Sequence, residues 1–228
     1  TMTCIIGRNG TGKSTLLRSI ARLQNRLGGD ILLNGHSIDS YAQDKFARLL
    51  SIVLTSRPNA QSMTVYELVA LGRTPYTGFW GRLGDEDRKI VDHALYMVGM
   101  QNMSRRRVCS LSDGECQKVM IAKSLAQGTP IILLDEPTAF LDFHGKVELL
   151  TLLRRLAHNE GKTILLSTHD LEAALQTADR LWMLDKNGIH EGEPKLLVAN
   201  GDVDRYIGQK GVSVDEDFRI KISVSDNK

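Results

Sequence analysis

A run of residues near the start of the chain carries the clearest chemical pattern. It follows the spacing G-x-x-x-x-G-K-[ST], the glycine-rich loop that binds the phosphate groups of a nucleotide. Its glycines allow unusual backbone angles and leave room for a phosphate to approach. Lys13 can neutralise the terminal phosphates, and the Ser14 hydroxyl can ligate Mg²⁺. The run predicts a nucleotide site made by Gly7, Arg8, Asn9, Gly10, Thr11, Gly12, Lys13, Ser14 and Thr15.

Two adjacent carboxylates form a second chemical feature. Asp135 and Glu136 directly follow Ile131-Ile132-Leu133-Leu134, a wholly apolar run that predicts a strand in the centre of a parallel sheet. Two carboxylates directly after such a strand can have different roles: Asp135 can bind Mg²⁺, and Glu136 can act as a general base on a water molecule. Acidic residues also end many strands without a catalytic role. The phosphate loop on the same chain favours the catalytic interpretation.

The elements around the phosphate loop are those that its chemistry requires. Residues 2–6 form a short apolar run that predicts a buried strand. After the loop, apolar residues recur at helical spacing until Gly28-Gly29. A strand, a glycine turn and a helix in this order aim backbone N–H groups and the positive helix end at one point.

The rest of the chain alternates between expected strands and helices, which indicates a doubly wound α/β fold with a mostly parallel sheet. Apolar runs predict further strands at 30–33, 51–54, 163–167 and 180–184, and helices at 41–50, 143–159 and 171–178. Three successive helices, starting after Thr64, Gly84 and Ser112, predict an inserted helical subdomain. Thr64 and Glu67 have the spacing of a capping box at the start of the first of these helices, and Gly72 is expected to end it. We expect a phosphate-loop core from residues 1–55 and 128–200, a helical subdomain from 56–127, and a tail from 201–228 that ends in a half-exposed strand over 218–224.

The composition is that of an ordinary globular protein. Of the 228 residues, 42% are hydrophobic and 25% are charged. The formal net charge of +2 does not indicate a nucleic-acid partner. The three cysteines lack metal-binding spacing, and we interpret them as small hydrophobic residues in a reducing cytosol. Because the first expected strand begins directly after Thr1, we expect the sequence to be a fragment.

The stretch Leu111-Ser112-Asp113-Gly114-Glu115 connects these motifs to a known family. Alone, Ser112 and Glu115 have the spacing of a helix capping box. Together with the phosphate loop and Asp135-Glu136, the stretch resembles the Leu-Ser-Gly-Gly-Gln signature of the ATP-binding-cassette (ABC) ATPases. Ser112 and Gly114, which in that family approach phosphate across a dimer interface, are intact. Asp113 and Glu115 depart from the signature and place two negative charges beside an anionic ligand.

Further stretches follow the order of the same family. The segment 138–142 resembles the D-loop, with Asp142 at its acidic position, and 167–170 resembles the H-loop. The resemblance implies that His169 hydrogen-bonds the γ-phosphate and the attacking water, with Glu136 and Lys13 as its catalytic partners. Two features depart from the family. Thr55 stands where a glutamine is usual, with Gln61 further along. The adenine-stacking aromatic residue and the N-terminal antiparallel strands are absent from this sequence, so we expect weak ATP affinity and poor discrimination against GTP.

The resemblance also implies a biological setting. It predicts an ATPase subunit on the cytoplasmic face of the cell membrane that works with Mg²⁺ and with separate integral-membrane permease subunits. Two copies would form a homodimer around two ATP molecules. The stretch 64–76 is similar to importers of iron chelates, haem and cobalamin, and the loops 55–63 and 73–84, the latter with Tyr76, Phe79 and Trp80, are expected to face the permease. Two alternatives remain. One is a module with weak or no hydrolysis, and the other is a non-transport ABC ATPase such as a DNA-repair head.

Overall fold

The structure, a computed structural model, describes residues 1–60, 62–78, 81–186, 188–209 and 211–222. Within these residues the chain builds a six-stranded sheet in the order β4-β5-β6-β1-β7-β8. Every neighbouring pair is parallel except β7 and β8, which are antiparallel. The strands are β1 (Met2–Gly7), β4 (Leu50–Val53), β5 (Ile131–Leu134), β6 (Thr163–Thr168), β7 (Arg180–Asp185) and β8 (Gly188–Gly192). The expected mostly parallel α/β sheet is therefore confirmed.

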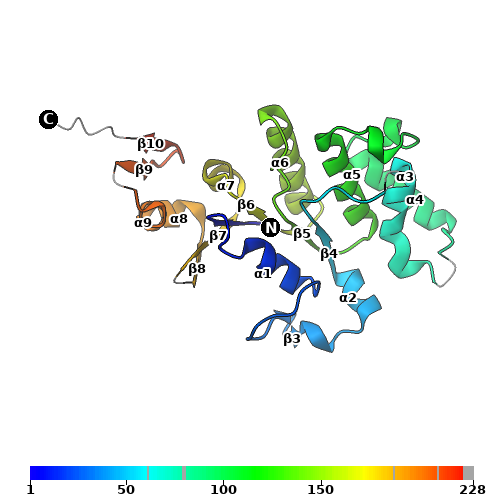
Figure 1. The fold of residues 1–228 in the computed structure, drawn as a ribbon, viewed down its shortest axis with the longest axis horizontal. Helices are drawn as coiled ribbons and strands as arrows, with labels where there is room; N and C mark the ends of the chain where they lie inside the picture. The colour runs from blue at the N-terminus through cyan, green and yellow to red at the C-terminus, as the bar shows by residue number, and fades with distance from the viewer. Residues whose placement is uncertain (61, 79–80, 187, 210, 223–228) are drawn as a thin grey trace.

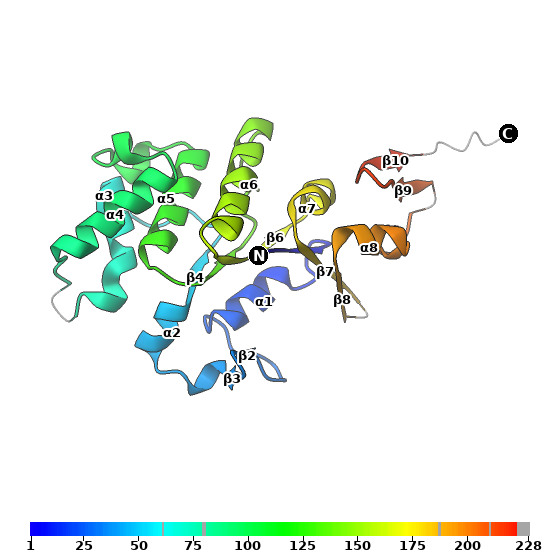
Figure 2. The ribbon, with the colours of Figure 1, turned by 180° about the vertical axis from the view of Figure 1, so that it is seen from behind.

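Strand β1 shows how the two faces of the sheet are covered. Its side chains alternate between the faces, as they must in an extended strand. Met2, Cys4 and Ile6 join the larger apolar core, which includes residues of α6 (Phe143–His158) and α7 (Leu171–Thr177). Ile5 joins a second core with Leu17 of α1 (Lys13–Ile20). Accordingly, α1 lies on the opposite face of the sheet from α6 and α7 (Figures 1 and 2).

Helix α1 is shorter than its sequence pattern predicted. It ends at Ile20, and Arg22 takes a left-handed backbone with φ of 58°. Leu27, which the helical pattern included, is fully exposed and so contributes nothing to the core. The strand expected over 30–33 is shorter in the structure, because only β2 (Leu32–Leu33) is extended and paired. It forms a hairpin with β3 (His36–Ser37), and the turn residues Asn34 and Gly35 both have positive φ.

Helices α3 (Val65–Ala70), α4 (Asp85–Met97) and α5 (Asp113–Ala126) pack together beyond the β4 edge of the sheet (Figure 1). The capping box at Thr64 is confirmed, because its hydroxyl accepts from the Glu67 amide while the Glu67 carboxylate accepts from the Thr64 amide. Among the described residues this layer contains no strand between β4 and β5. The remaining helices of this part are α2 (Gln43–Leu49) and the 3₁₀ turns η1 (Ile38–Ser40), η2 (Leu71–Tyr76), η3 (Gln101–Met103) and η4 (Val108–Ser110).

Gly72 has a different role from the helix stop that its sequence position indicated. The chain continues past it as η2, and Gly72 is buried against α5. A Cβ atom at this position would lie 2.3 Å from the carbonyl oxygen of Lys123 and 3.1 Å from the Cβ of Ala126. The glycine therefore permits two backbones to approach more closely than any side chain would allow.

This contact gives a testable result for stability. Gly72→Ala is expected to lower the free energy of unfolding by about 1–3 kcal/mol, the usual cost of overpacking. The matched control is Gly28→Ala, because a Cβ there would meet no atom within 4 Å. That control should change stability by no more than about 0.5 kcal/mol. Urea unfolding of both variants checks the prediction, and equal stability of the two would contradict the packing described.

The C-terminal part lies beyond the β8 edge of the sheet (Figure 1). It contains α8 (Pro194–Ala199), α9 (Asp202–Ile207), β9 (Val212–Val214) and β10 (Ile220–Ile222), and the last two strands pair as a separate antiparallel ribbon. The prediction of a strand over 218–224 is partly wrong. Phe218 has φ of 64° and lies in the turn before β10, while Val224 lies outside the described residues.

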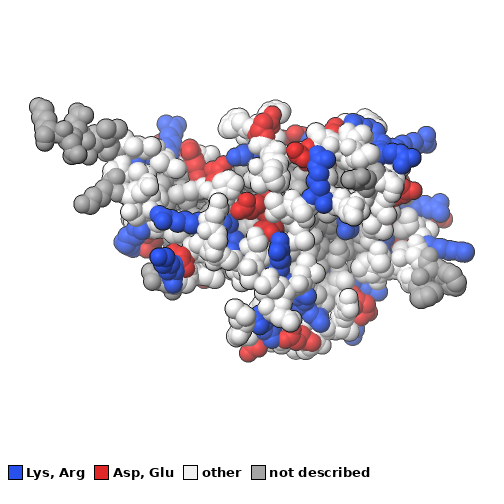
Figure 3. All heavy atoms as spheres, in the orientation of Figure 1, with Lys and Arg blue, Asp and Glu red and all other residues white. Residues whose placement is uncertain are grey.

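Acidic and basic side chains are interspersed over the face shown in Figure 3. No helix in the described part of the chain has both the length and the apolar character needed to cross a membrane.

Candidate active site

The predicted phosphate loop joins the end of β1 to the start of α1. Gly10 and Gly12 have φ of 81° and 97°, in the left-handed region where a side chain would be strained. Gly7 is needed for space instead, because a Cβ there would lie 2.5 Å from the Thr11 hydroxyl oxygen. The Thr11 hydroxyl and amide both donate to the Arg8 carbonyl, at 2.9 and 3.2 Å, and so close the turn.

The start of α1 presents its amides and one buried ammonium group to the loop. Gly12 caps the helix without a side chain, so no side-chain oxygen of the cap occupies the first-turn amides. The side chain of Lys13 is only 5% exposed, and its Nζ donates to the carbonyl oxygens of Gly7 at 2.7 Å and Arg8 at 3.4 Å. The amides and this ammonium suit a phosphate ligand. Arg8 and Asn9 are exposed beside the same loop.

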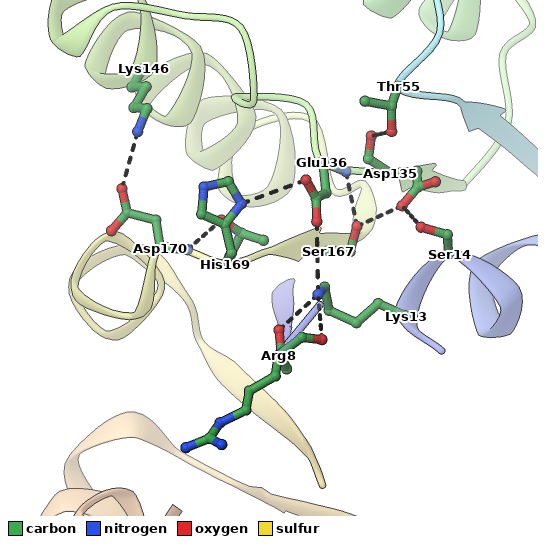
Figure 4. Close-up of polar contacts among 12 residues, drawn as sticks. Arg8, Lys13, Ser14, Thr55, Asp135, Glu136, Lys146, Ser167, His169 and Asp170 are labelled. Atoms are coloured by element: carbon green, nitrogen blue, oxygen red, sulfur yellow. Dashed lines mark hydrogen bonds and ion pairs between the residues drawn. The ribbon is translucent and has the colours of Figure 1, made fainter. Parts of the chain in front are cut away.

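The Asp135 carboxylate, directly after β5, connects the end of that strand to the phosphate loop. Its Oδ1 accepts hydrogen bonds from the hydroxyls of Ser14 at 2.8 Å and Ser167 at 2.9 Å (Figure 4). Asp135 is 1% exposed, so these hydroxyls replace water around the carboxylate. Parallel pairing of β5 with β6 sets this geometry, because Leu134 is opposite Leu166 and the following residues are therefore neighbours.

Glu136 lies between the other two predicted catalytic side chains, Lys13 and His169. Its Oε1 is 3.7 Å from the Lys13 Nζ, and its Oε2 is 3.5 Å from the His169 Nδ1 (Figure 4). His169 reaches this position because it directly follows β6, while Asp170 caps α7 by accepting from the Ala173 amide. The structure thus brings together Lys13, Glu136 and His169, which the sequence placed far apart.

Thr55 contacts the backbone behind the two carboxylates. Its hydroxyl donates to the main-chain carbonyl of Asp135 at 2.7 Å. In the sequence Thr55 stands out only as a departure from the usual glutamine, and nothing in the local pattern predicts this bond. Gln61, the alternative glutamine, lies outside the described residues.

The residues around Asp135 fit a small hard cation by their chemistry. The Ser14 hydroxyl and the Asp135 carboxylate supply oxygen ligands of the kind that Mg²⁺ prefers, and they already lie within hydrogen-bond distance of each other. The described residues contain no cluster of three or more His, Cys, Asp or Glu side chains suited to a metal. A site with few protein oxygens is typical of Mg²⁺ bound together with nucleotide phosphates.

The signature residues lie at the N-terminus of α5, in the helical layer rather than under the sheet with α1 (Figure 1). The Ser112 hydroxyl caps the helix by accepting from the Glu115 amide. Gly114 lies near the D-loop segment, where a Cβ on it would be 3.4 Å from Leu141 Cδ2. Asp142 of that segment caps α6 by accepting from the Gly145 amide.

The two acidic departures from the signature are each paired with an arginine. Arg57, from the loop after β4, contacts the Asp113 carboxylate at 2.6 Å, and this hydrogen bond raises the pKa of Arg57. Arg106 lies 3.5 Å from the Glu115 carboxylate. These arginines offset the negative charge that the departures would otherwise bring to an anionic ligand. Neither arginine could be predicted from the sequence, because neither is adjacent to the signature along the chain.

The cysteines follow the sequence prediction at two of three positions. Cys4 and Cys116 are buried, and burial raises the pKa of the Cys4 thiol to about 12. Both therefore stay neutral and inert near neutral pH. Cys109 is exposed, so it does not serve as a small hydrophobic residue of the core, unlike the other two cysteines.

Together the loop, the paired carboxylates and the histidine define a phosphate-loop nucleotide-binding protein with a helical layer beside its sheet. The sequence profile of the ABC transporter family matches residues 1–139. The chain belongs to this family, whose ATP-binding proteins are ATPases.

Several relatives and solved structures resemble the chain over most of its length. It is 39% identical to the iron(3+)-hydroxamate import ATP-binding protein FhuC of Bacillus subtilis, over 96% of this chain and 81% of FhuC. It is 37% identical to the ferric enterobactin transport ATP-binding protein FepC of Escherichia coli, over 94% of this chain and 79% of FepC. A dimeric bacterial ABC transporter cassette matches with a TM-score of 0.74 and 28% identity over 85% of each chain. The same cassette as a post-hydrolysis dimer with ADP and Pi matches with a TM-score of 0.73, 28% identity and the same coverage.

Proposed function

We propose that this chain is the ATP-hydrolysing subunit of an importer for iron-siderophore, haem or cobalamin-type compounds, acting at the cytoplasmic face of the cell membrane. The observation that carries the proposal is the convergence of Lys13, Asp135, Glu136 and His169 on the phosphate loop. The import functions named for FhuC and FepC support the substrate class.

Each residue has a chemical role in the proposed reaction. The loop amides and Lys13 bind the β- and γ-phosphates, and Ser14 with Asp135 would hold Mg²⁺, which would neutralise phosphate charge. Glu136 accepts a proton from the attacking water as general base. His169 orients that water and the γ-phosphate, and it contacts the Glu136 oxygen that does not face Lys13. The position of Glu136 between Lys13 and His169 supports this assignment.

A complete site in this proposal needs two copies of the chain. Residues from Gly7 to Thr15 of one copy face Ser112 and Gly114 of the other, with ATP between them. The helix N-terminus at Ser112 provides the positive end suited to a phosphate. The dimeric cassettes that resemble this chain support the arrangement. Asp142, at the D-loop position, is assigned to the same interface.

The permease subunits are assigned to a groove in the helical layer, within the proposed subdomain 56–127. An open groove of about 520 Å³ runs along α3 between the two loops expected to face the permease. Its lining includes Ser62, Met63, Tyr66, Leu71, Thr74 and Leu83. Phe79 and Trp80 lie outside the described residues.

Tyr76 has a role within the chain rather than the free docking role expected from the sequence. Its ring lies under two guanidinium groups, with Arg73 at 3.9 Å and Arg48 at 4.7 Å from the ring centre. Its hydroxyl donates to the Gln127 carbonyl at 3.1 Å. Tyr76 therefore joins η2 to α2 and to the end of α5, and the groove, rather than Tyr76, is the proposed permease contact.

Site-directed crosslinking tests the groove as a docking surface. In a Cys109→Ser background, Thr74→Cys should crosslink to a permease subunit in membranes that hold the whole transporter, because Thr74 is exposed and lines the groove. Lys195→Cys, which is also exposed but lies on α8, is the control and should not. Crosslinking from Lys195→Cys but not from Thr74→Cys would contradict the assignment.

A further inference from the structure

One hydroxyl from strand β6 and one from the loop after strand β4 hold the segment Asp135–Glu136. Strand β5 ends at Leu134, between β4 and β6 in the sheet. From the β4 side, the Thr55 hydroxyl donates to the Asp135 carbonyl at 2.7 Å. From the β6 side, Ser167 contacts both residues of the segment. The direction in which the two carboxylates leave the strand therefore depends on neighbouring polar side chains.

The Ser167 hydroxyl makes two bonds at the centre of this arrangement. It accepts from the Glu136 amide at 2.9 Å and donates to Asp135 Oδ1 at 2.9 Å (Figure 4). Ser167 is 0% exposed, so water has no direct route to replace it. Because Ser14 also donates to Asp135 Oδ1, one continuous set of hydrogen bonds joins the phosphate loop, Asp135 and the Glu136 backbone.

Glu136 has a backbone conformation that needs such support. Its φ of 47° is in the left-handed region, which is unfavourable for a residue that carries a Cβ atom. Such conformations persist where the surroundings hold them, and they concentrate at functional sites. The bond from the Glu136 amide to Ser167 ties this backbone to β6, and so directs the Glu136 carboxylate toward Lys13 and His169.

We propose that Ser167 is a positioning residue for ATP hydrolysis. Its hydroxyl fixes the left-handed backbone of Glu136 and the orientation of the Asp135 carboxylate at the same time, without itself contacting the substrate. This inference rests on the proposed function, in which Glu136 is the general base and Asp135 assists Mg²⁺. It predicts that removing one buried hydroxyl slows the reaction and weakens the response to Mg²⁺ while the phosphate loop still binds ATP.

The test compares Ser167→Ala with Ser167→Thr, which keeps the hydroxyl. Ser167→Ala should lower kcat about 10- to 100-fold, since two hydrogen bonds in the site are lost. Its Kd for ATP, measured with EDTA present, should stay within about threefold of the unmodified value, because the loop itself is intact. The Mg²⁺ concentration for half-maximal activity should rise, and Ser167→Thr should recover most of the activity. Ser124→Ala is the matched control, because Ser124 is also buried but bonds to Ser51 away from the carboxylates.

Two results would overturn the inference. One is Ser167→Ala with kcat and Mg²⁺ response like those of the unmodified chain. The other is Ser167→Thr as inactive as Ser167→Ala while both remain folded, because the hydroxyl would then not be what matters. Glu136→Gln in the same assay separates this failure from that of the proposed function. If Glu136→Gln is inactive and Ser167→Ala is fully active, the base assignment stands and only the role of Ser167 is wrong. If Glu136→Gln is fully active, both are wrong.

Discussion

Replacing Glu136 with glutamine is expected to cut ATP hydrolysis about 100-fold or more, the usual size of a general-base effect. Glutamine has nearly the same shape but cannot accept the proton of the attacking water. ATP binding should persist, because Lys13 donates to the carbonyls of Gly7 and Arg8 and so keeps its place without the Glu136 carboxylate. Steady-state phosphate release and nucleotide titration measure the two effects separately.

The matched control is Glu191→Gln on β8, where the carboxylate is 56% exposed. It removes the same charge at a distance from the site and should leave hydrolysis unchanged. A Glu136→Gln protein that hydrolyses ATP at the unmodified rate would contradict the assignment of Glu136 as base.

Lys13→Ala is expected to act on binding rather than on the chemical step alone. Losing a buried ammonium that pairs with phosphate should raise the Kd for ATP about tenfold or more. The loop itself should also loosen, because the Lys13 Nζ donates to the Gly7 carbonyl at 2.7 Å. Isothermal titration with ATP checks the result.

Lys195→Ala serves as the control for charge, because Lys195 is exposed on α8. Its ATP affinity should match that of the unmodified chain. If Lys13→Ala binds ATP as tightly as Lys195→Ala does, the phosphates are held by groups other than those proposed.

The sequence could predict those parts of the site that depend on local order along the chain. The phosphate loop is one continuous run, and its strand, turn and helix are neighbours in sequence as well as in space. The capping boxes at Thr64 and Ser112 are equally local, since each joins residues three positions apart. The parallel sheet followed from apolar strands alternating with helices.

Features that depend on which strands are neighbours could not be predicted in the same way. The bonds from Ser167 and Thr55 to the Asp135–Glu136 segment arise because β6 and β4 flank β5. The order of strands in a sheet cannot be predicted from the local sequence pattern of each strand. A signal existed in hindsight, namely a polar residue near the end of each neighbouring apolar strand. The pairing of Arg57 with Asp113 joins a loop to a helix in the same non-local way.

Helix ends were the other weak point, for a physical reason. Leu27 fits the helical spacing of α1 but is fully exposed, so periodicity alone overestimated the length of the helix. Gly72 was expected to stop a helix, yet its small size serves close packing against Lys123 of α5. A glycine in a sequence does not say whether it supplies a backbone angle or a missing side chain.

The most direct test of the whole account is the mass of Glu136→Gln with and without ATP and Mg²⁺, measured by sedimentation velocity. Each site is proposed to combine the phosphate loop of one copy with Ser112 and Gly114 of another, and slow hydrolysis should trap that state. We expect a monomer without nucleotide and a dimer with ATP and Mg²⁺. Lys13→Ala should remain a monomer under both conditions. A Glu136→Gln protein that binds ATP and Mg²⁺ fully yet stays a monomer would contradict the two-copy site.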